Sequence, residues 1–557
     1  LRILETLYSD CLERMERFIE DLAATPGKHH PEQYGDFKKV LDQLAKHPNE
    51  RYFILKSIII NNLFGVDIME EAVEICKLRL FLKLVAQVEK VSQIEPLPDI
   101  DFNIRAGNTL VGYATLDQVR KSQEGTLGFS KEQIRRIEED AEMVERAFRQ
   151  FRAQQTTHGG KVTRKDKQEL RARLGKLDAE LDRYLAGEYG VNVEKQKDFE
   201  AWKASHEPFH WFVDFYGIMS AGGFDVIIGN PPYVELSDVA DQYTLRGYTL
   251  QNTGNLYAVC IERFLTLLGL RARAGVIIPI SSISTPRMLP LMRILACQPG
   301  LHVSNFAVRP GKLFTGVDMN LVISLVSSDS QGSARLPVYT TGHNRWAEDA
   351  RPAIFANLTY VDTQLDERAA AIPKLGTPLE RQLFSKICAY PRLDDLSFKG
   401  ATERLYYHSG GRYFRKCLRS KLSNEYKELV IPKGTSGQLI CVLSSSLYHW
   451  FWLVLSDCYH VTKRDVGIVP IPDTVLSDKC LARIAERLLA DLERNAKVRI
   501  RTRADGTEQK EVNYYVGKSK AILDEIDAAI APHYGLNATE LDFILNVDAK
   551  YRIVDAG

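Results

Sequence analysis

The chain has 557 residues, of which 45% are hydrophobic and 26% charged, so it carries enough apolar material for two to four globular domains. Its formal net charge of only +1 excludes a uniformly basic nucleic-acid-binding protein, although basic residues can still gather in one cleft. Nine scattered cysteines without a CxxC pair, and no apolar run near the ~18 residues that span a bilayer, predict a cytoplasmic protein with no membrane segment and no metal site.

The N-terminal part predicts helices followed by two short strands. Apolar residues recur at helical spacing over residues 1–25, and a polar connector separates this helix from another that ends near residue 45. A strand is expected at residues 63–68, and the sequence "EEAVEICKLRLFLKLVAQV" after it has the pattern of an amphipathic helix. A second short strand and a turn are expected in "FNIRAGNTLVGY".

Residues 129–186 differ in composition from their surroundings. Two charged, proline-free segments, "KEQIRRIEEDAEMVERAFRQF" and "KDKQELRARLGKLDAELDRYL", are joined by "TTHGGKVT" and predict an antiparallel helical hairpin. The composition favours a solvated insertion, and a contact with DNA or a partner protein is the alternative.

Strands are expected again at residues 224–228, 274–279 and 321–326, with the helix "NLYAVCIERFLTLLGL" between the first two. This alternation predicts an α/β domain with a mostly parallel sheet. Short strands and loops replace the pattern up to about residue 480, and helices then return around a basic link, "KVRIRTRADGTEQK". The expected divisions are the first part of the α/β domain, the hairpin, the second part of the α/β domain, a mixed α+β domain and a helical tail, at residues 1–125, 126–200, 201–334, 335–480 and 481–557.

The segment "GGFDVIIGNPPYVEL" carries the strongest chemical signal. Its apolar run, expected to be a buried strand, is followed by Asn230, Pro231, Pro232 and Tyr233. Proline fixes φ and has no backbone N–H, so this segment is stiff and holds hydrogen-bond acceptors still. Open α/β sheets bind their ligands at the carboxyl ends of strands, which is where the segment is expected to lie.

This combination resembles the signature of S-adenosylmethionine-dependent DNA methyltransferases that act on amines. The resemblance implies that the side-chain oxygen of Asn230 and the carbonyl of Pro231 accept both hydrogens of an exocyclic aromatic amine. The nitrogen then moves towards tetrahedral geometry, and its lone pair is freed to attack the sulfonium methyl group. Pro232 stiffens the carbonyl, and Tyr233 stacks on the base, which must be flipped out of the duplex.

Further motifs extend the resemblance over about residues 1–330. The segments "SIIINNLFGVDIMEEAVEICKLRLFLKL", "FNIRAGNTLVG", "PFHWFVDFYGIMSAGGFDVIIGNPPYVEL" and "KLFTGVDMNLVISLV" are similar, in this order, to those of large γ-class adenine-specific DNA methyltransferases of type IIG restriction–modification and phage-defence systems. The fold implied is a Rossmann-like sheet with a helical-hairpin insertion, followed by a mixed α+β target-recognition domain and a helical tail. The reaction implied is methylation of the N6 amine of adenine in double-stranded DNA of a bacterium or archaeon, near the nucleoid, with a fused or associated restriction endonuclease.

Asp67 ends its predicted strand, where dinucleotide-binding folds place the acid that binds a ribose hydroxyl. Capping of the following helix is the alternative. Asn108 follows the next strand, where its amide can read an adenine ring, although a Gly-Asn turn also explains it. The resemblance makes Asp67, Ile68 and Asn108 the expected S-adenosylmethionine site. It makes Phe314 the second residue that packs on the flipped base, with an ordinary core position as the alternative.

The mixed α+β domain is expected to read the DNA sequence. Its segment "YYHSGGRYFRK" combines aromatic, glycine and basic residues, as loops that contact phosphates and bases do, and "HVTKRDVGIVPIP" resembles the end of the family's recognition domain. The expected DNA contacts are Arg412, Tyr413, Lys463 and Arg464, with solvated loops as the alternative.

Two features depart from this pattern. The family's glycine-rich first motif should precede Asp67 and is absent from the sequence, so we expect the chain to begin just after that loop and to be inactive by itself. The string "HEPFH" fits the zinc-protease pattern HExxH, but Pro208 argues against the single helix that this chemistry needs. Two other functions remain as alternatives: a non-catalytic DNA-binding specificity protein, and an amine methyltransferase that acts on protein or RNA.

Overall fold

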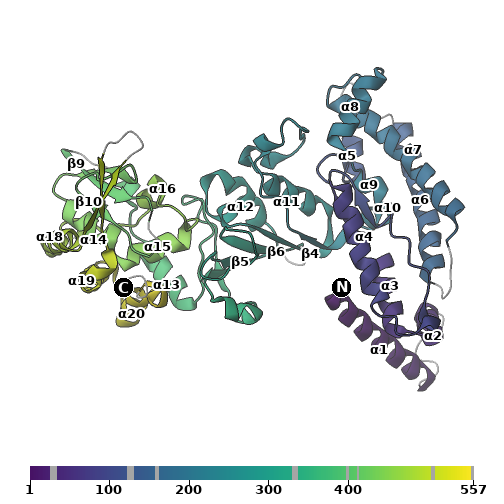
Figure 1. The fold of residues 1–557 in the computed structure, drawn as a ribbon, viewed down its shortest axis with the longest axis horizontal. Coiled ribbons are helices and arrows are strands. Elements are labelled where there is room, and N and C mark those ends of the chain that lie inside the picture. Colours follow the sequence, from purple (N-terminus) through teal and green to yellow (C-terminus); the bar gives the residue numbers. More distant parts are fainter. Residues whose placement is uncertain are drawn as a thin grey trace. The chain divides into compact units, whose positions relative to one another are not determined.

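The computed structural model describes residues 1–24, 34–121, 131–156, 162–328, 337–396, 400–410, 413–502 and 508–552. The chain divides into two compact units, whose elements are labelled in Figure 1. Unit 1 consists of Leu1–Asp225, Val234–Gln251 and Val259–Gly269, and unit 2 of Val226–Tyr233, Asn252–Ala258 and Leu270–Gly557.

Unit 1 begins with three helices, α1 (Arg2–Ala24), α2 (Gly35–Lys46) and α3 (Glu50–Asn61). The sequence predicts the first two. It does not predict α3, because its residues from Tyr52 to Ile60 are all buried and the helix therefore has no polar face that would give a helical period. The side chain of Asn49 caps α3 by accepting a hydrogen bond from the N–H of Tyr52.

Both predicted strands of unit 1 are present and form a parallel pair. β1 (Gly65–Asp67) pairs with β2 (Ile104–Ala106), and Asp67 lies opposite Ala106. The helix α4 (Glu70–Val85) follows β1, as predicted. Because the two strands are parallel, the segments that follow them start at the same edge of the sheet.

The predicted hairpin is confirmed by α6 (Lys131–Thr156) and α7 (Arg164–Glu188), which run beside each other (Figure 1). Its inner face is buried. Phe151 and Leu181 of the hairpin share a core with Val111, which follows β2. The expectation of a solvated insertion therefore holds only for the outer face. The remaining helices of unit 1 are α5 (Leu116–Lys121), α8 (Gln196–His206), α9 (Trp211–Asp214), α10 (Tyr216–Ser220) and most of α11 (Leu256–Leu267).

Unit 2 contains a six-stranded sheet in the order β3-β4-β6-β5-β7-β8. The strands are β3 (Phe224–Gly229), β4 (Leu268–Pro279), β5 (Gly300–Phe306), β6 (Leu321–Ser327), β7 (Val338–Asn344) and β8 (Val361–Thr363). β6 runs antiparallel to both β4 and β5, whereas β5 and β7 are parallel. The sheet is mixed, so the expectation of a mostly parallel sheet is wrong. The reason is that residues 307–320 connect β5 to β6 without a crossover helix, which brings β6 back antiparallel beside β5.

β3 forms one end of this sheet. Its side chains Val226 and Ile228 are 58% and 84% exposed. The expectation of a buried strand is wrong for these residues, because both lie on the same face of the sheet and that face is uncovered there. Within the described ranges, no strand pairs with the outer edge of β3.

The rest of unit 2 combines helices with a three-stranded sheet in the order β10-β9-β11. One hydrophobic core extends from Val361 to Val547 and so includes residues on both sides of position 480. The strands are β9 (Thr402–His408), β10 (Cys417–Leu418) and β11 (Tyr426–Pro432). The helices are α12 (Leu289–Ala296), α13 (Pro378–Ile387), α14 (Ser436–Ser444), α15 (Ser446–Leu455), α16 (Lys463–Gly467), α17 (Asp473–Leu476), α18 (Lys479–Arg494), α19 (Lys520–Ile530), α20 (Ala538–Asn546) and α21 (Ala549–Arg552).

The basic link predicted between the tail helices is instead part of a two-stranded hairpin. β12 (Lys497–Thr502) pairs antiparallel with β13 (Glu508–Asn513). The alternation of Val498 and Ile500 with basic residues has the period of a strand, and the expectation of a simple link overlooked it.

No single helix among the described residues is long and apolar enough to cross a membrane. The pair α14 and α15, bent by 61°, passes this test of length and composition only when both helices are taken together.

Candidate active site

The segment from Asn230 to Tyr233 directly follows β3, as the sequence predicts. Asn230 is exposed, Pro231 is buried and Tyr233 is half-buried. The hydroxyl group of Tyr233 donates to Oδ1 of Asn230 over 2.8 Å and lies 3.0 Å from the carbonyl oxygen of Ile277 in β4. Its single hydrogen is therefore shared between two acceptors, and the tyrosine fixes the side-chain oxygen of Asn230 against the end of β4.

Burial raises the pKa of the Tyr233 phenol to about 12. The group is therefore neutral at physiological pH and acts as a hydrogen-bond donor. An amide oxygen and the carbonyls of a proline-rich segment are neutral acceptors, so this site is suited to bind the N–H groups of a neutral amine. The described residues contain no group of three or more His, Cys, Asp or Glu side chains placed to hold a metal ion.

Phe314 lies half-buried in the loop that joins β5 to β6. Pairing of Pro279 with Leu321 places the end of this loop at the edge of the sheet where β4 ends. The loop is anchored by a hydrogen bond from the N–H of Gly311 to the carbonyl oxygen of Trp346, over 2.8 Å. The structure thus places Phe314 on an anchored loop at the edge where β4 ends and where Tyr233 contacts Ile277.

Asn320, at the end of the same loop, has a role that the sequence did not suggest. Its Oδ1 accepts from the N–H of Val308, and its Nδ2 donates to the carbonyl oxygen of Asp457 over 3.1 Å. The N–H of Asn320 donates to the hydroxyl oxygen of Tyr459 over 2.5 Å. The loop before β6 is therefore tied to the segment that precedes α16. The only sequence signal was a single asparagine before a strand, which is too common to identify such a contact.

The expected cofactor residues meet at the carboxyl ends of β1 and β2. Asp67 is exposed, and its Oδ1 accepts from the N–H of Met69, so it also caps the turn that leads into α4. Ile68 is 41% exposed. The N–H of Gly107 donates to the carbonyl oxygen of Asp67 over 2.9 Å, which brings the segment that contains Asn108 next to the acid.

Asn108 is 3% exposed, and its Oδ1 accepts from the N–H of Leu110. Its Nδ2 is buried and has no hydrogen-bond partner among the residues that the structure describes. A buried donor without an acceptor costs about 1–3 kcal/mol, so it suits a ligand that brings an acceptor. A ring nitrogen of adenine is such an acceptor, and the exposed carboxylate of Asp67 suits a ribose hydroxyl. These residues therefore fit the adenosine part of S-adenosylmethionine.

The four expected DNA contacts have different surroundings. Arg412 lies outside the described residues. The ring of Tyr413 is half-buried, with the guanidinium of Arg345 5.3 Å from its centroid. Lys463 is exposed. Among the three of these residues that the structure describes, only Lys463 presents a charged side chain to solvent in the manner that the DNA-contact hypothesis requires.

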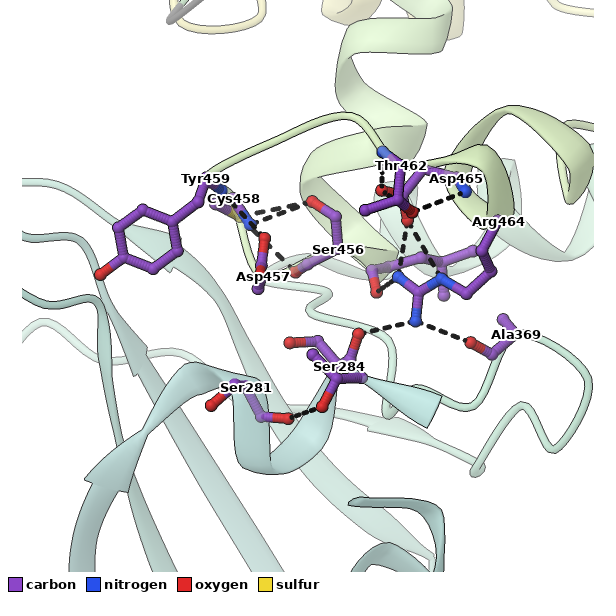
Figure 2. A network of polar contacts seen from close by, with 12 residues as sticks. Ser281, Ser284, Ala369, Ser456, Asp457, Cys458, Tyr459, Thr462, Arg464 and Asp465 are labelled. Atoms are coloured by element: carbon purple, nitrogen blue, oxygen red, sulfur yellow. Dashed lines mark hydrogen bonds and ion pairs between the residues drawn. The ribbon is translucent and has the colours of Figure 1, made fainter. Parts of the chain in front are cut away.

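Arg464 is held inside unit 2, as Figure 2 shows. Its side chain is 18% exposed and pairs with Asp465 at 2.6 Å. Its Nη1 donates to the carbonyl oxygens of Ser284, at 2.7 Å, and Ala369, at 3.0 Å. The guanidinium therefore joins three chain segments that are far apart in sequence, and this geometry favours a structural role.

The histidines of "HEPFH" do not lie on one helix. α8 ends at His206, Glu207 has a left-handed backbone with φ of 44°, and His210 precedes α9. His206 contacts Thr244, whereas His210 contacts Asp182. The two rings have separate hydrogen-bond partners, in agreement with the expectation from Pro208.

Comparison with known proteins finds a family match for one region of the chain. Residues 61–289 match the Eco57I restriction-modification methylase family. The matched region contains Asp67, Asn108 and the Asn230–Tyr233 segment and ends before Phe314.

A protein of Methanocaldococcus jannaschii described as a type II restriction enzyme and methyltransferase is 31% identical over 238 residues, which cover 36% of this chain. The chain spans only about one fifth of that relative's length, since the match covers 20% of it.

Two solved structures also share a distant likeness. The type IIL restriction-modification enzyme MmeI, in complex with DNA, matches 97% of this chain and 78% of its own, at 13% identity and a TM-score of 0.35. A nuclease-deletion mutant of the type ISP enzyme LlaGI, in complex with a DNA substrate mimic, matches 89% of this chain and 69% of its own, at 12% identity and a TM-score of 0.29. TM-scores this low carry no weight for function.

Proposed function

We propose that this protein is a site-specific DNA methyltransferase that transfers the methyl group of S-adenosylmethionine to the N6 amine of adenine in double-stranded DNA. The observation that carries the proposal is the Asn230–Tyr233 segment. It lies at the end of a strand, within the region that matches a restriction-modification methylase family, and its amide oxygen is oriented by a tyrosine at 2.8 Å.

The roles follow from the chemistry of the target. An adenine amine is a poor nucleophile because its lone pair is delocalised into the ring. Oδ1 of Asn230 and the carbonyl of Pro231 accept the two amine hydrogens, which favours a tetrahedral nitrogen with a free lone pair. Pro232 restricts the backbone that carries this carbonyl. The ring of Tyr233 stacks on the flipped base, and Phe314 packs on its other face.

S-adenosylmethionine, when bound, supplies an electrophilic methyl group. Asp67 would accept a hydrogen bond from its ribose, Nδ2 of Asn108 would donate to its adenine ring, and Ile68 would contact the same ring. The support is the meeting of these residues at the ends of β1 and β2, together with the unpartnered amide of Asn108.

Calorimetric titration of S-adenosylmethionine into residues 1–557, beside the variants Asp67→Ala and Asn108→Ala, tests this cofactor site. Equal affinity of all three proteins would contradict it.

Target recognition is assigned to residues 335–480, with Lys463 contacting phosphate and Tyr413 a base or sugar. We propose that Arg464 does not touch DNA, because its donors are used within unit 2. Arg412 keeps its proposed role as a DNA contact. A fused or associated restriction endonuclease and a place beside the nucleoid of a bacterium or archaeon complete the proposal.

The decisive experiment is methylome sequencing of cells that express the complete gene, compared with cells that express Asn230→Ala. Adenine N6 methylation at one short sequence in the first cells, and its loss in the second, is the expected result. The exposed Asp238 lies nearby in the sequence and provides the control, since Asp238→Asn should leave the methylation pattern unchanged. Sequence-specific DNA binding without methylation would favour a non-catalytic specificity protein, and methylation of protein or RNA alone would favour the other alternative.

A further inference from the structure

The segment from Gly107 to Tyr113 in unit 1 is held by the chain that follows α8. The N–H of Asn108 donates to the carbonyl oxygen of Glu207 over 2.7 Å, and the N–H of Phe209 donates to the carbonyl oxygen of Val111 over 2.8 Å. We call residues 107–113 the adenine loop, after the role proposed for Asn108. Its shape is fixed by hydrogen bonds to a neighbouring segment rather than by a sheet.

Two glycines allow this close approach. A Cβ on Gly112, where φ is 131°, would lie 2.1 Å from the carbonyl oxygen of Phe209. A Cβ on Gly107, where φ is 154°, would lie 3.0 Å from the side chain of Phe209. The adenine loop therefore lies directly against Phe209, and a displacement of this residue would displace the loop.

His210 forms one of the contacts that connect the adenine loop to the helical hairpin, beside the core contacts of Val111 and a hydrogen bond from the Tyr113 hydroxyl to Glu188 of α7 over 2.9 Å. The ring is 1% exposed, and its Nδ1 lies 3.2 Å from the N–H of Tyr113. Because a backbone N–H can only donate, Nδ1 is an acceptor, and the ring proton is on Nε2. Nε2 lies 3.1 Å from Oδ1 of Asp182, a residue of α7 that is itself 2% exposed.

Asp182 is fixed in turn by Lys203 of α8, whose Nζ lies 2.6 Å from its other oxygen. The backbone N–H of His210 donates to Asp214, which forms an ion pair with Arg105 in β2. His210 is thus held by one carboxylate at its ring and another at its backbone, and all of these groups belong to unit 1.

We infer that His210 and Asp182 are positioning residues for the adenine loop, and that the helical hairpin is the support through which they act. Asp182 selects the imidazole tautomer whose Nδ1 accepts the Tyr113 N–H, and this hydrogen bond holds the loop in the shape that presents Asn108. The inference rests on the proposed function, because it assigns the loop to the adenine ring of the cofactor.

Two measurements on the chain of residues 1–557 test the inference separately from the proposed function. The first is amide hydrogen exchange of the adenine loop, which reports its order without a ligand. The second is saturation-transfer NMR from the adenine H2 and H8 protons of S-adenosylhomocysteine, which reports the ligand and detects weak binding.

Asp182→Leu and His210→Gln should speed exchange of the adenine loop by about tenfold or more and weaken the adenine signal. His210→Asn should rescue both, because its amide oxygen can take the place of Nδ1, whereas the longer His210→Gln cannot accept at that point. Asp182→Asn should also retain both, since it keeps Oδ1 as an acceptor.

Asp178→Asn is the matched control. Asp178 lies one turn before Asp182 on α7, its side chain is 23% exposed, and it pairs with Arg105 at 3.9 Å. Asp178→Asn removes a carboxylate from the same helix but keeps both hydrogen bonds of the His210 ring, so it should change neither exchange of the loop nor the adenine signal.

Unchanged exchange in the folded His210→Gln variant would overturn the inference, as would an adenine signal that stays at the wild-type level although the loop exchanges faster. If Asp182→Leu does not fold, the two His210 variants decide. If the wild type gives no adenine signal while the variants still exchange faster, the proposed cofactor site fails, and the hydrogen-bonded support of the loop stands.

Discussion

The hydroxyl of Tyr233 and the side-chain oxygen of Asn230 are joined by a 2.8 Å hydrogen bond. This bond uses one of the two lone pairs of Oδ1, the atom that the proposed chemistry assigns to the adenine amine. The second lone pair stays available to the amine, while the tyrosine, whose hydroxyl also lies 3.0 Å from the carbonyl oxygen of Ile277, holds the amide in place.

The first prediction separates the ring of Tyr233 from its hydroxyl. Tyr233→Phe keeps the ring and frees Asn230, so methyl transfer by the complete protein should stay within about tenfold of wild type. Tyr233→Ala should lower transfer by about 5- to 150-fold, because stacking of a base on an aromatic ring is worth about 1–3 kcal/mol. The measurement is single-turnover transfer of a labelled methyl group.

The stacking role is checked directly with 2-aminopurine in place of the target adenine. Its fluorescence should rise less on binding to wild type and Tyr233→Phe than on binding to Tyr233→Ala, because a stacked ring quenches the extruded base. Equal brightness in all three proteins would remove Tyr233 from the base-binding site.

The second prediction concerns the phenol of Tyr233, whose pKa burial raises to about 12. The folded protein retains this proton, so the contribution to stability is complete below pH 10 and is lost as the pH rises from about 10 to 12. Tyrosinate absorbance, recorded milliseconds after a pH jump, should differ between wild type and Tyr233→Phe only in the step near pH 12. A difference near pH 10 would show that the hydroxyl is not held as described.

The third prediction contrasts two neighbouring basic residues. Arg464→Met leaves the carboxylate of Asp465, which is 3% exposed, without its ion pair and should destabilise unit 2 by about 3–5 kcal/mol. Lys463→Met, on the surface, should change stability by no more than about 0.5 kcal/mol. Thermal unfolding of both variants gives the comparison.

In DNA binding, Lys463→Met should have the larger effect and Arg464→Met the smaller one. Lys463→Met is expected to reduce the slope of log affinity against log salt concentration by about 1, as the loss of one phosphate contact does. An Arg464→Met variant that is as stable as wild type but binds DNA more weakly would restore the DNA role of Arg464.

The fourth prediction concerns the stability of the fold at acidic pH. Burial lowers the pKa of His449 to about 3, and the ring is surrounded by Asp548 on one side and by the cations Arg415 and Arg552. The unfolded chain takes up this proton near pH 6.5, so stability falls as the pH drops from 6.5 towards 3, by about 1.4 kcal/mol for each pKa unit.

His449→Gln should therefore lose less stability than wild type between pH 7 and pH 4.5, measured by urea unfolding and the fluorescence of the buried tryptophans of α15. The exposed His460 provides the control, since His460→Gln should follow the wild-type curve. A His449→Gln curve identical to that of wild type would mean that the ring is protonated in the folded state.

The fifth prediction concerns sequence recognition. Replacing residues 335–480 with the equivalent part of a relative should change the methylated DNA sequence and leave the methyl transfer itself intact. The hydrophobic core extends from Val361 to Val547 and so crosses position 480. Residues 481–552 should therefore be exchanged together with 335–480, so that this core stays whole. An unchanged recognition sequence would move specificity elsewhere, with the helical hairpin as the next candidate.

The sequence predicts much of this architecture where the local signal is strong. The helices α1, α4, α6 and α7 are amphipathic or charged and were found at the expected positions. α3 escaped prediction because a helix that is buried all round has no periodic pattern, and the mixed order of the sheet depends on the path of one loop.

In the candidate site, too, strong local signals in the sequence were predictive and tertiary contacts could not be foreseen. Asn230 and Tyr233 were predictable because prolines after a strand form an unusual local string. The hydrogen bond between their side chains, and the role of Asp182 in holding His210, depend on tertiary contacts. Asp182 is one carboxylate among many in a charged helix, and nothing in its sequence neighbourhood distinguishes it from those that face solvent.

The exposed end strand β3 has a consequence for the behaviour of the chain in solution. Val226 and Ile228 are β-branched residues on a strand whose outer edge has no neighbour within the described ranges. Such an edge is a template for pairing with another chain, and natural proteins usually protect it with charge, proline or a bulge. Self-association through β3 would compete with folding more strongly as the concentration of newly made chains rises. The yield of folded protein would therefore fall as the expression level increases. The substitution Val226→Lys should reduce this loss without touching Asn230.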